Sequence, residues 1–300
     1  MVAKVILNPY SARWRAEKRF PEAARALEEV GLAFEVARSE GRGHCTALAE
    51  EAVREGFSPI IVAGGDGTIG EVVNGMMNAS ADDEDLPPLG ILPLGTANDL
   101  VFNLKMSTDF QDMAKVIAAG KTRALDLCKV NDRYFVNNTA LGLEPLVTLT
   151  QEKITLVKGT PRYLMAALSA IFSGTSWDAK LTWDDGSYEG PISLISVGNG
   201  ACTGGLFYVV PHADPFDGRI TFTFGYAKSR LRMLTILPAM MKPGQGNYVE
   251  MDEISEFHTT HLHVKLLQSS PSHADGEIFD RALYEADYRI EPQRLPVLMP

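Results

Sequence analysis

The segment IIVAGGDGTIGEVVNG, residues 60–75, places Asp66 inside a run of glycines. Glycines expose backbone N–H groups without side-chain obstruction, and a helix that begins near Ile69 adds its positive end, so the segment favours a phosphate. A carboxylate about 4 Å from that phosphate would oppose it by about 4 kcal/mol at an effective dielectric constant of 20. A Mg²⁺ ion shared by Asp66 and the β and γ oxygens of a nucleoside triphosphate turns this repulsion into a net attraction. We therefore interpret Asp66 as a metal ligand in a triphosphate site.

Two other interpretations of this segment stay open. Asp66 can be the cap of a helix in a tight glycine turn, with no ligand at all. Gly65, Gly67 and Gly70 also satisfy the G-x-G-x-x-G spacing of a dinucleotide site, but the acidic residues about 20 positions on lie in the 80–88 loop and not at the end of a strand. The Walker pattern GxxxxGK[ST] is absent from the sequence.

A second turn, PLGTANDL, again joins a strand to a helix. In an open α/β sheet, two such turns face each other at the carboxyl edge, where ligands bind. Thr68 and Thr96 can donate hydroxyls to phosphate, and Asp99 and Asp126 can extend the carboxylate network. For Asn98 or Asp99 alone, an ordinary helix cap explains the residue equally well.

The first 120 residues alternate between strand and helix patterns. Short apolar runs predict strands over 4–8, 59–63 and 89–92, and the i, i+3, i+4, i+7 spacing after the first two predicts amphipathic helices. A helix from Thr108 or Asp109 to Gly120 completes the pattern. The sequence therefore predicts a parallel sheet covered by helices.

From residue 122 the pattern becomes mostly antiparallel β. Hairpins are predicted over Asn131–Asp132 and over 184–186, and helices over 160–172, with Thr160 as its cap, and 229–241. We expect a nucleotide-binding α/β domain over 1–125, with 285–300 as its candidate completion, and a β-rich domain over 126–284. The 80–88 loop is interpreted as a solvated connection.

Composition restricts the class of protein. The chain has 300 residues, 45% of them hydrophobic, and a net charge of −10. This negative charge argues against an extended electrostatic surface for binding nucleic acid. Three distant cysteines indicate neither disulfides nor a zinc site. No signal peptide or membrane span is expected, so we predict a cytoplasmic protein.

Five segments together resemble a known family. NPYSA, GGDGTIGEVVNG, PLGTAND, GNGACTGGLFYVVPHADPFDG and ADGE occur in the order found in diacylglycerol kinase catalytic domains, including bacterial lipid kinases and sphingosine and ceramide kinases. GGDGT alone is shared with NAD kinases and phosphofructokinases, and the other motifs narrow the resemblance. It implies an ATP- and Mg²⁺-dependent lipid kinase with a nucleotide-binding α/β domain, a β-sandwich domain and an active site in the cleft between them. The resemblance and the second turn together give the expected contacts for ATP. These residues are Asn8, Pro9, Tyr10, Ser11, Ala12, Ser39, Gly64, Gly65, Asp66, Gly67, Thr68, Ile69, Gly70, Gly95, Thr96 and Asn98.

The resemblance also implies roles in the second half of the chain. Asp275 is similar to the family's proton acceptor, with Glu277 beside it, and Asp217 to a structural Mg²⁺ ligand, joined by backbone carbonyls near Asp214 and Arg219. From the residues alone, HADGE between β segments is more typical of an Asp-Gly turn.

The chain departs from the family pattern at three places. Ala12 stands where the family has glycine, Ser39 replaces threonine, and residues 100–102 are Leu-Val-Phe where many relatives have Phe-Ala-Arg. These changes put nucleotide affinity and preference in doubt but remove no carboxylate.

The remaining candidates concern metal and membrane. Alternation over 261–266 places His261 and His263 on a wet strand face, which favours a surface strand over a metal site. The helix over 160–172 and the segment LTILPAMMKPG are apolar enough for core or for a lipid surface. We thus expect a lipid substrate and transient contact with the inner membrane face, and a homodimer is compatible with the sequence. The alternatives are an NAD kinase-like enzyme and a non-catalytic lipid-binding or regulatory member of the fold.

Overall fold

The chain forms two compact units. The computed structural model describes residues 2–80, 85–154, 160–173 and 176–300, and the side chains of Glu152, 160–164 and Ser173 lie outside that description. The first unit comprises Met1–Leu127, Arg133–Val136 and Glu291–Pro300, and the second comprises Cys128–Asp132 and Asn137–Ile290. Strands β5 (Thr122–Val130) and β16 (Glu277–Leu298) each contribute residues to both units.

The first unit contains a parallel sheet, as the alternating pattern predicts. Its strands are β1 (Ala3–Leu7), β2 (Phe34–Arg38), β3 (Ile60–Gly64) and β4 (Leu89–Pro93), in the order β2-β1-β3-β4, with the end of β16 parallel to β4 at Val297. Every residue of β3 and β4 is buried. This continuous burial is typical of parallel strands that are covered on both faces.

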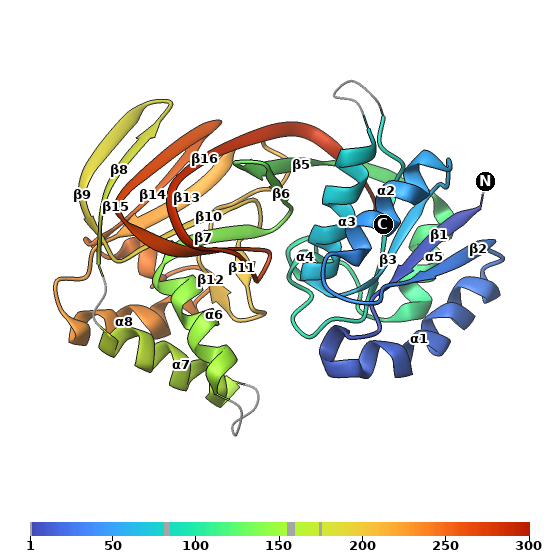
Figure 1. Cartoon of the computed structure of the whole chain (residues 1–300), viewed down its shortest axis with the longest axis horizontal. Coiled ribbons are helices and arrows are strands. Elements are labelled where there is room, and N and C mark those ends of the chain that lie inside the picture. Colours follow the sequence, from blue (N-terminus) through green and yellow to red (C-terminus); the bar gives the residue numbers. More distant parts are fainter. Residues whose placement is uncertain (1, 81–84, 155–159, 174–175) are drawn as a thin grey trace. The chain divides into compact units, whose positions relative to one another are not determined.

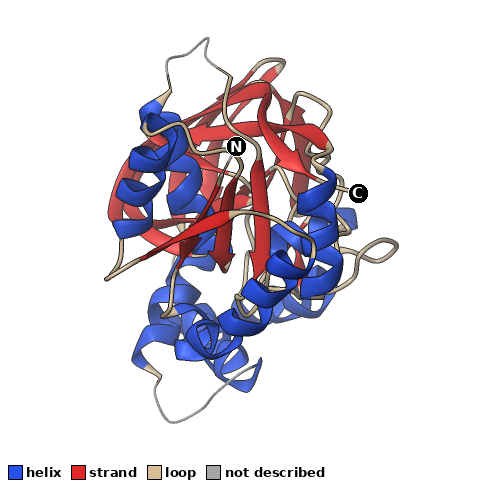
Figure 2. Cartoon of the chain, turned by 90° about the vertical axis from the view of Figure 1, so that its right-hand side faces the viewer, coloured by secondary structure: helices blue, strands red, loops and turns tan. Residues whose placement is uncertain are grey.

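Helices cover both faces of this sheet (Figure 2). α1 (Ser11–Glu29) packs against α5 (Phe110–Ala119), whereas α2 (His44–Arg54) packs against α3 (Asp66–Ala79). The two helices α2 and α3 cross closely at Gly75. A Cβ at this position would lie 2.1 Å from the carbonyl oxygen of Thr46, so the crossing leaves no room for a side chain. The predicted cap of α5 is confirmed for Asp109, whose carboxylate accepts hydrogen bonds from the backbone of the first turn, and Gly120 ends the helix with φ 67°.

The second unit is a mostly antiparallel β-sandwich, as expected (Figure 1). Its main strands follow the order β14-β13-β10-β7-β15-β16, with β8 paired to β15 and β9 to β8. The predicted hairpin over 184–186 is confirmed, since Trp183 pairs with Gly186. β5 also pairs with β6 (Arg133–Phe135) across Asn131 and Asp132, as predicted. The other strands of this unit are β7 (Asn138–Gly142), β8 (Trp177–Trp183), β9 (Gly186–Ile192), β10 (Leu194–Gly198), β11 (Cys202–Thr203), β12 (Phe207–Tyr208), β13 (Ile220–Gly225), β14 (Ile254–Thr259) and β15 (His261–Ala274).

The strand face of β15 confirms the predicted alternation. Leu262, Val264 and Leu266 are buried, while the imidazoles of His261 and His263 lie on the wetter face. There His261 contacts Asp287 and His263 contacts Glu285 on β16. These histidines are therefore paired surface residues.

Helices cluster at one end of the second unit (Figure 1). They are α6 (Leu143–Lys153), α7 (Thr160–Ser173), α8 (Arg230–Met240) and the short 3₁₀ helix η1 (Tyr248–Glu250). α7 begins at Thr160, the first residue of its predicted range, and the side chain of Thr160, its predicted cap, lies outside the described part of the chain. Within the described residues, none of the helices has the length and apolarity needed to cross a membrane.

Candidate functional site

The carboxyl ends of four adjacent strands carry most of the predicted ATP contacts. Asn8 follows β1, Ser39 follows β2, Gly65 follows β3, and Gly95 follows β4 by two residues. Because these strands are parallel and neighbours in one sheet, their ends lie along one edge of the first unit. The fold thus brings together segments that are up to 87 positions apart in the sequence, from Asn8 to Gly95.

A cluster of polar side chains links the first two motifs. The amide of Asn8 donates to the Thr68 hydroxyl at 3.0 Å, and the Ser11 hydroxyl lies 3.2 Å from the same oxygen. Tyr10, between them, donates through its hydroxyl to the backbone carbonyl of Glu40 at 3.0 Å. The first loop is therefore tied both to α3 and to the segment after β2.

Ser39 brings an unpaired polar atom to this edge. Its backbone N–H donates to the carbonyl of Leu7 at 2.8 Å, and its side chain is 3% exposed. The Ser39 hydroxyl has no hydrogen-bond partner among the described residues. Buried hydroxyls are normally paired, so this hydroxyl at the carboxyl edge of the sheet is free to bond to a polar ligand.

The two glycine turns lie in contact, as the sequence predicts. A Cβ at Gly65 would come within 2.9 Å of the Gly95 Cα, and a Cβ at Gly95 within 2.5 Å of the Gly65 Cα. Asn98, with φ 54°, accepts a hydrogen bond from the Gly95 N–H through its side chain and stands at the N-cap position of α4 (Asp99–Asn103). Thr96, at the tip of this turn, is exposed.

Asp66 links the two glycine turns through a hydrogen bond that the sequence analysis did not predict. It is the first residue of α3, yet its carboxylate accepts a hydrogen bond at 3.1 Å from the backbone N–H of Leu100, in the first turn of α4. Burial raises the pKa of Asp66 above the ordinary 3.8, although backbone N–H groups around it, that of Leu100 foremost, act in the opposite direction. A half-buried carboxylate whose surroundings disfavour its charge is one that a bound cation would stabilise.

The other two acids of the predicted network are buried. Asp99 is 6% exposed at the start of α4, and Asp126 is fully buried. One carboxylate oxygen of Asp126 accepts a hydrogen bond at 2.8 Å from the backbone of Gln293, so Asp126 anchors the C-terminal strand of the first unit. Within the described ranges, no three His, Cys, Asp or Glu side chains form a metal-binding cluster. A cation at this edge would thus rest on few carboxylates and on ligand oxygens, as Mg²⁺ commonly does with nucleotides.

Ala12 adopts a backbone conformation that favours glycine. Its φ is 50°, and Arg13 and Trp14 follow with φ values of 59° and 69°. Three consecutive left-handed residues interrupt the start of α1, and each costs roughly 1–2 kcal/mol relative to a right-handed residue. A glycine at this position would relieve that strain at residue 12.

In the second unit, Asp275 lies in an Asp-Gly turn and is nevertheless buried. Asp275 and Gly276 join β15 to β16 with φ values of 49° and 79°, the pattern of a two-residue hairpin turn. The carboxylate accepts backbone hydrogen bonds from Asn137 at 2.9 Å and Asn138 at 3.3 Å, and the residue is 5% exposed. Glu277, the first residue of β16, is half-buried. The turn interpretation is confirmed, and the burial is what an ordinary surface turn would lack.

The predicted structural metal loop is a pair of side-chain-stabilised turns. The Asp214 carboxylate accepts from the Phe216 N–H at 3.1 Å, and the Asp217 carboxylate accepts from the Arg219 N–H at 2.9 Å. The Asp217 N–H also donates to the Asp214 carbonyl at 3.4 Å. These bonds explain the turn conformation through aspartate side chains bonding to nearby backbone.

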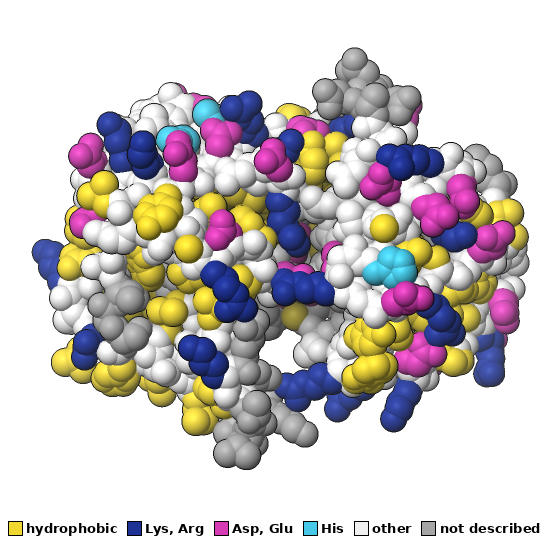
Figure 3. Space-filling model, in the orientation of Figure 1, with side chains coloured by type: hydrophobic (Ala, Val, Ile, Leu, Met, Phe, Trp, Pro, Cys, Tyr) yellow, Lys and Arg dark blue, Asp and Glu magenta, His cyan; other side chains and the backbone are white. Residues whose placement is uncertain are grey.

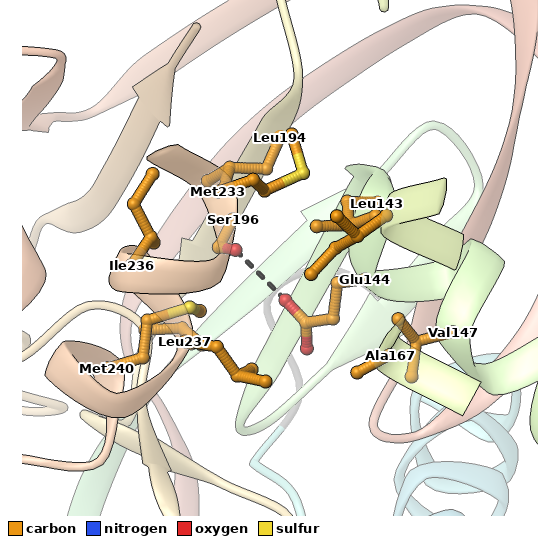
Figure 4. Close-up of a pocket in the computed structure, with 12 residues that line it drawn as sticks. Leu143, Glu144, Val147, Ala167, Leu194, Ser196, Met233, Ile236, Leu237 and Met240 are labelled. Carbon is orange, nitrogen blue, oxygen red and sulfur yellow. Dashed lines mark hydrogen bonds between the residues drawn. The ribbon is translucent and has the colours of Figure 1, made fainter. Parts of the chain in front are cut away.

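A narrow apolar cavity lies in the second unit between α6, α7, α8 and β10 (Figure 4). Its volume is about 30 Å³, and apart from Glu144 and Ser196 its lining is apolar. The Glu144 carboxylate accepts from the Ser196 hydroxyl at 2.9 Å and contacts His273 Nε2 at 3.0 Å. His273 is 2% exposed, and its Nδ1 has no partner among the described residues.

Sequence reasoning missed this polar set and one further carboxylate. Glu144 lies 52 positions from Ser196 and 129 from His273, so no local spacing joins them. Glu71 is buried in α3, where it accepts hydrogen bonds from the backbone of Gly43 at 2.8 Å and of Cys45 at 3.1 Å. A signal for Glu71 was available, because a glutamate on the apolar face of a predicted helix needs a buried partner.

Comparisons with known proteins agree with this architecture. The diacylglycerol kinase catalytic domain matches residues 2–130, and the YegS C-terminal NAD kinase beta sandwich-like domain matches residues 137–299. The chain is 28% identical over 276 residues to a diacylglycerol kinase of Staphylococcus carnosus, covering 92% of this chain and 88% of that protein. It is 32% identical over 220 residues to one of Staphylococcus epidermidis, covering 73% of this chain and 68% of that protein. The fold resembles the crystal structure of a putative diacylglycerol kinase from Bacillus anthracis with a TM-score of 0.78 at 21% identity, over 100% of this chain and 97% of that one. This chain belongs to the diacylglycerol kinase family.

Proposed function

We propose that this protein transfers the γ-phosphate of Mg-ATP to the hydroxyl of a lipid, of which diacylglycerol, sphingosine and ceramide are the candidates. The observation that carries the proposal is the convergence of Asn8, Ser39, Gly65 and Gly95 on the carboxyl edge of one parallel sheet. Membership of the diacylglycerol kinase family supports the same reaction class.

The nucleotide site is assigned to the loops of the first unit. Asn8, Ser11 and Thr68 present a connected set of polar groups, and Ser39 supplies a buried hydroxyl without a partner among the described residues. The N-terminus of α3 adds backbone N–H groups that favour phosphate. The bare backbone of Gly65 and Gly95 keeps side chains out of this cradle.

Asp66 is assigned as the protein ligand of Mg²⁺. A divalent cation supplies neutralisation of the charge that develops on the transferred phosphoryl group. Asp66 holds its place through the Leu100 N–H, so the carboxylate is already oriented before a ligand arrives. Asp99 and Asp126 are assigned to extend its carboxylate network, and the Asp214–Arg219 turns are assigned to a separate structural cation.

Asp275 is assigned as the acceptor of the lipid's hydroxyl proton, with Glu277 next to it on β16. Phosphoryl transfer from ATP to an alcohol needs such a base, and a carboxylate held by the backbone of Asn137 and Asn138 has a fixed orientation. We place the protein in the cytoplasm, bound reversibly to the inner membrane face where its substrate lies. A homodimer is compatible with this activity and is measured directly by light scattering.

The test is incubation of the purified protein with radiolabelled ATP, Mg²⁺ and mixed micelles that each contain one candidate lipid. We expect label in one lipid, loss of that label in Asp66→Ala and Asp275→Ala, and retention in Gly41→Ala, where an added Cβ meets no atom within 4 Å. Absence of transfer to every lipid, or full activity in both aspartate variants, would falsify the proposal. A parallel assay for NADP⁺ formation tests the NAD kinase alternative, and nucleotide binding without turnover would favour a non-catalytic role.

A further inference from the structure

Helix α7 carries apolar side chains on its solvent face as well as on its buried face. Met165, Leu168 and Phe172 are 48%, 41% and 56% exposed, and their i, i+3, i+7 spacing places them on one side of the helix. Ala166, Ala167, Ala170 and Ile171, on the other side, are buried. No charged residue occurs between 165 and 172. An ordinary surface helix would have polar residues on the outer face.

Helix α8 and the residues that flank it add exposed apolar side chains and positive charge. Leu231 is 77% exposed and Met241 is 38% exposed. Residues 226–242 contain four cations and no acid, although the whole chain has a net charge of −10. Arg232 is paired with Glu253 at 2.7 Å, while Lys228, Arg230 and Lys242 are exposed. Figure 3 shows hydrophobic side chains with Lys and Arg between them along the lower edge of the second unit, over α7 and α8.

The same two helices wall the apolar cavity beside Glu144. Ala167 and Ile171 of α7 and Met233, Ile236, Leu237 and Met240 of α8 line it. The buried residues around it form three separate small clusters, which Leu143, Leu237 and Met240 join in pairs. At about 30 Å³ the cavity is far below the roughly 300 Å³ of small ligand sites, so a lipid chain can enter it only if one of its walls moves.

We propose that the outward faces of α7 and α8, here called the α7–α8 face, form the surface that docks on an anionic lipid bilayer. Large apolar side chains beside exposed cations match the acyl boundary and the negative headgroups of such a bilayer. The proposal rests on the proposed function, since a kinase for a membrane lipid must reach its substrate at the bilayer. Docking there places two helical walls of the cavity directly against the lipid.

The chain offers a matched pair of leucines for the test. Leu231 on α8 and Leu267 on β15 are 77% and 74% exposed and belong to the same unit, but only Leu231 lies on the α7–α8 face. We expect the full-length protein to co-sediment with phosphatidylcholine vesicles that contain phosphatidylglycerol, more weakly without it, and more weakly at high salt. Leu231→Ser is expected to lower the partition coefficient by about tenfold, the effect of losing the burial of most of one leucine side chain, and Leu267→Ser to leave it unchanged.

A second readout separates this proposal from the proposed function. Leu231 is outside the assigned ATP and proton-acceptor residues, so Leu231→Ser is expected to keep wild-type transfer to a short-chain lipid that is dispersed without vesicles. Equal vesicle binding by both variants and wild type, with kinase activity present, would overturn the docking surface and leave the function standing. Leu231-dependent vesicle binding without transfer to any lipid would support the surface and remove the function. A wild-type dimer that Leu231→Ser dissociates, with no vesicle binding, would assign this face to a second copy of the chain and overturn the proposal.

Discussion

The carboxylate of Asp66 accepts a hydrogen bond from the backbone N–H of Leu100 at 3.1 Å, so the acid of one glycine turn fixes the helix that follows the other. The bond spans 34 positions of sequence and joins the GGDGT and GTAND motifs into one unit. Two requirements conflict at Asp66. Burial disfavours its charged form, whereas binding of a divalent cation requires that form.

Asp66→Asn tests this conflict through pH. Because burial raises the pKa of Asp66, the folded state holds its proton more tightly than the unfolded state, and stability should fall as pH rises from about 3.8 toward the raised value. The asparagine cannot titrate but still accepts the Leu100 hydrogen bond, so we expect that component of the fall to disappear and the variant to be at least as stable as wild type at pH 7. Urea unfolding across this pH range measures the effect. Phosphoryl transfer should be lost, and an Asp66→Asn protein with full activity would contradict the assignment of Asp66 as the cation ligand.

Gly65→Ala tests the contact between the two turns. Its Cβ would lie 2.9 Å from the Gly95 Cα, and because that atom is backbone, the turns must separate. We expect a loss of about 1–3 kcal/mol in the free energy of unfolding, together with weaker ATP binding measured by calorimetry. Gly41→Ala, in the same unit and with open space around the new Cβ, should change neither quantity.

Ala12→Gly is expected to stabilise the protein. Relief of the left-handed conformation at φ 50° exceeds the added flexibility of glycine in the unfolded chain, for a net gain of about 0.5–1 kcal/mol in the free energy of unfolding. Ala16→Gly, at a buried position later in α1, should instead destabilise by about 1 kcal/mol. A lower denaturation midpoint for Ala12→Gly would show that the left-handed turn is not a source of strain.

Asp275→Asn and Asp275→Ala separate structure from chemistry at the β15–β16 turn. Asparagine keeps an oxygen acceptor for the N–H groups of Asn137 and Asn138, so we expect a folded protein with a greatly reduced kcat. Alanine leaves both N–H groups without that acceptor and should also lower the free energy of unfolding, by about 1–3 kcal/mol. If the asparagine variant turned over like wild type, another group would have to accept the proton.

Glu144→Gln and Glu144→Ala test how much the hydrogen bonds of Glu144 to Ser196 and His273 contribute to stability beside the apolar cavity. Glutamine can still accept from His273 and bond to Ser196, whereas alanine removes the partner of both side chains. We expect the alanine variant to lose about 1–3 kcal/mol more than the glutamine variant in thermal or urea unfolding. Equal stability of the two would mean that water replaces the carboxylate without cost.

The amino-acid sequence by itself determined the elements and the loops between them. Strand β3, the cap of α5 at Asp109 and the alternation of His261 with Leu262 follow from hydrophobic period and turn chemistry within a few neighbouring residues. The sheet edge that carries both Asn8 and Gly95 was also predictable, because parallel β/α alternation places strand ends together. Such features are local or follow from topology.

Only the tertiary structure decided which side chains meet across long separations. The hydrogen bond from Leu100 to Asp66, the hydrogen bond from Gln293 to Asp126, and the contact of His273 with Glu144 span 34, 167 and 129 positions. Their partners are set by how elements pack and by the rule that a buried polar group must find a bond, and neither leaves a spacing in the sequence. The burial of the Asp275 turn and the outward apolar side of α7 are decided in the same way, because exposure depends on what the rest of the chain covers.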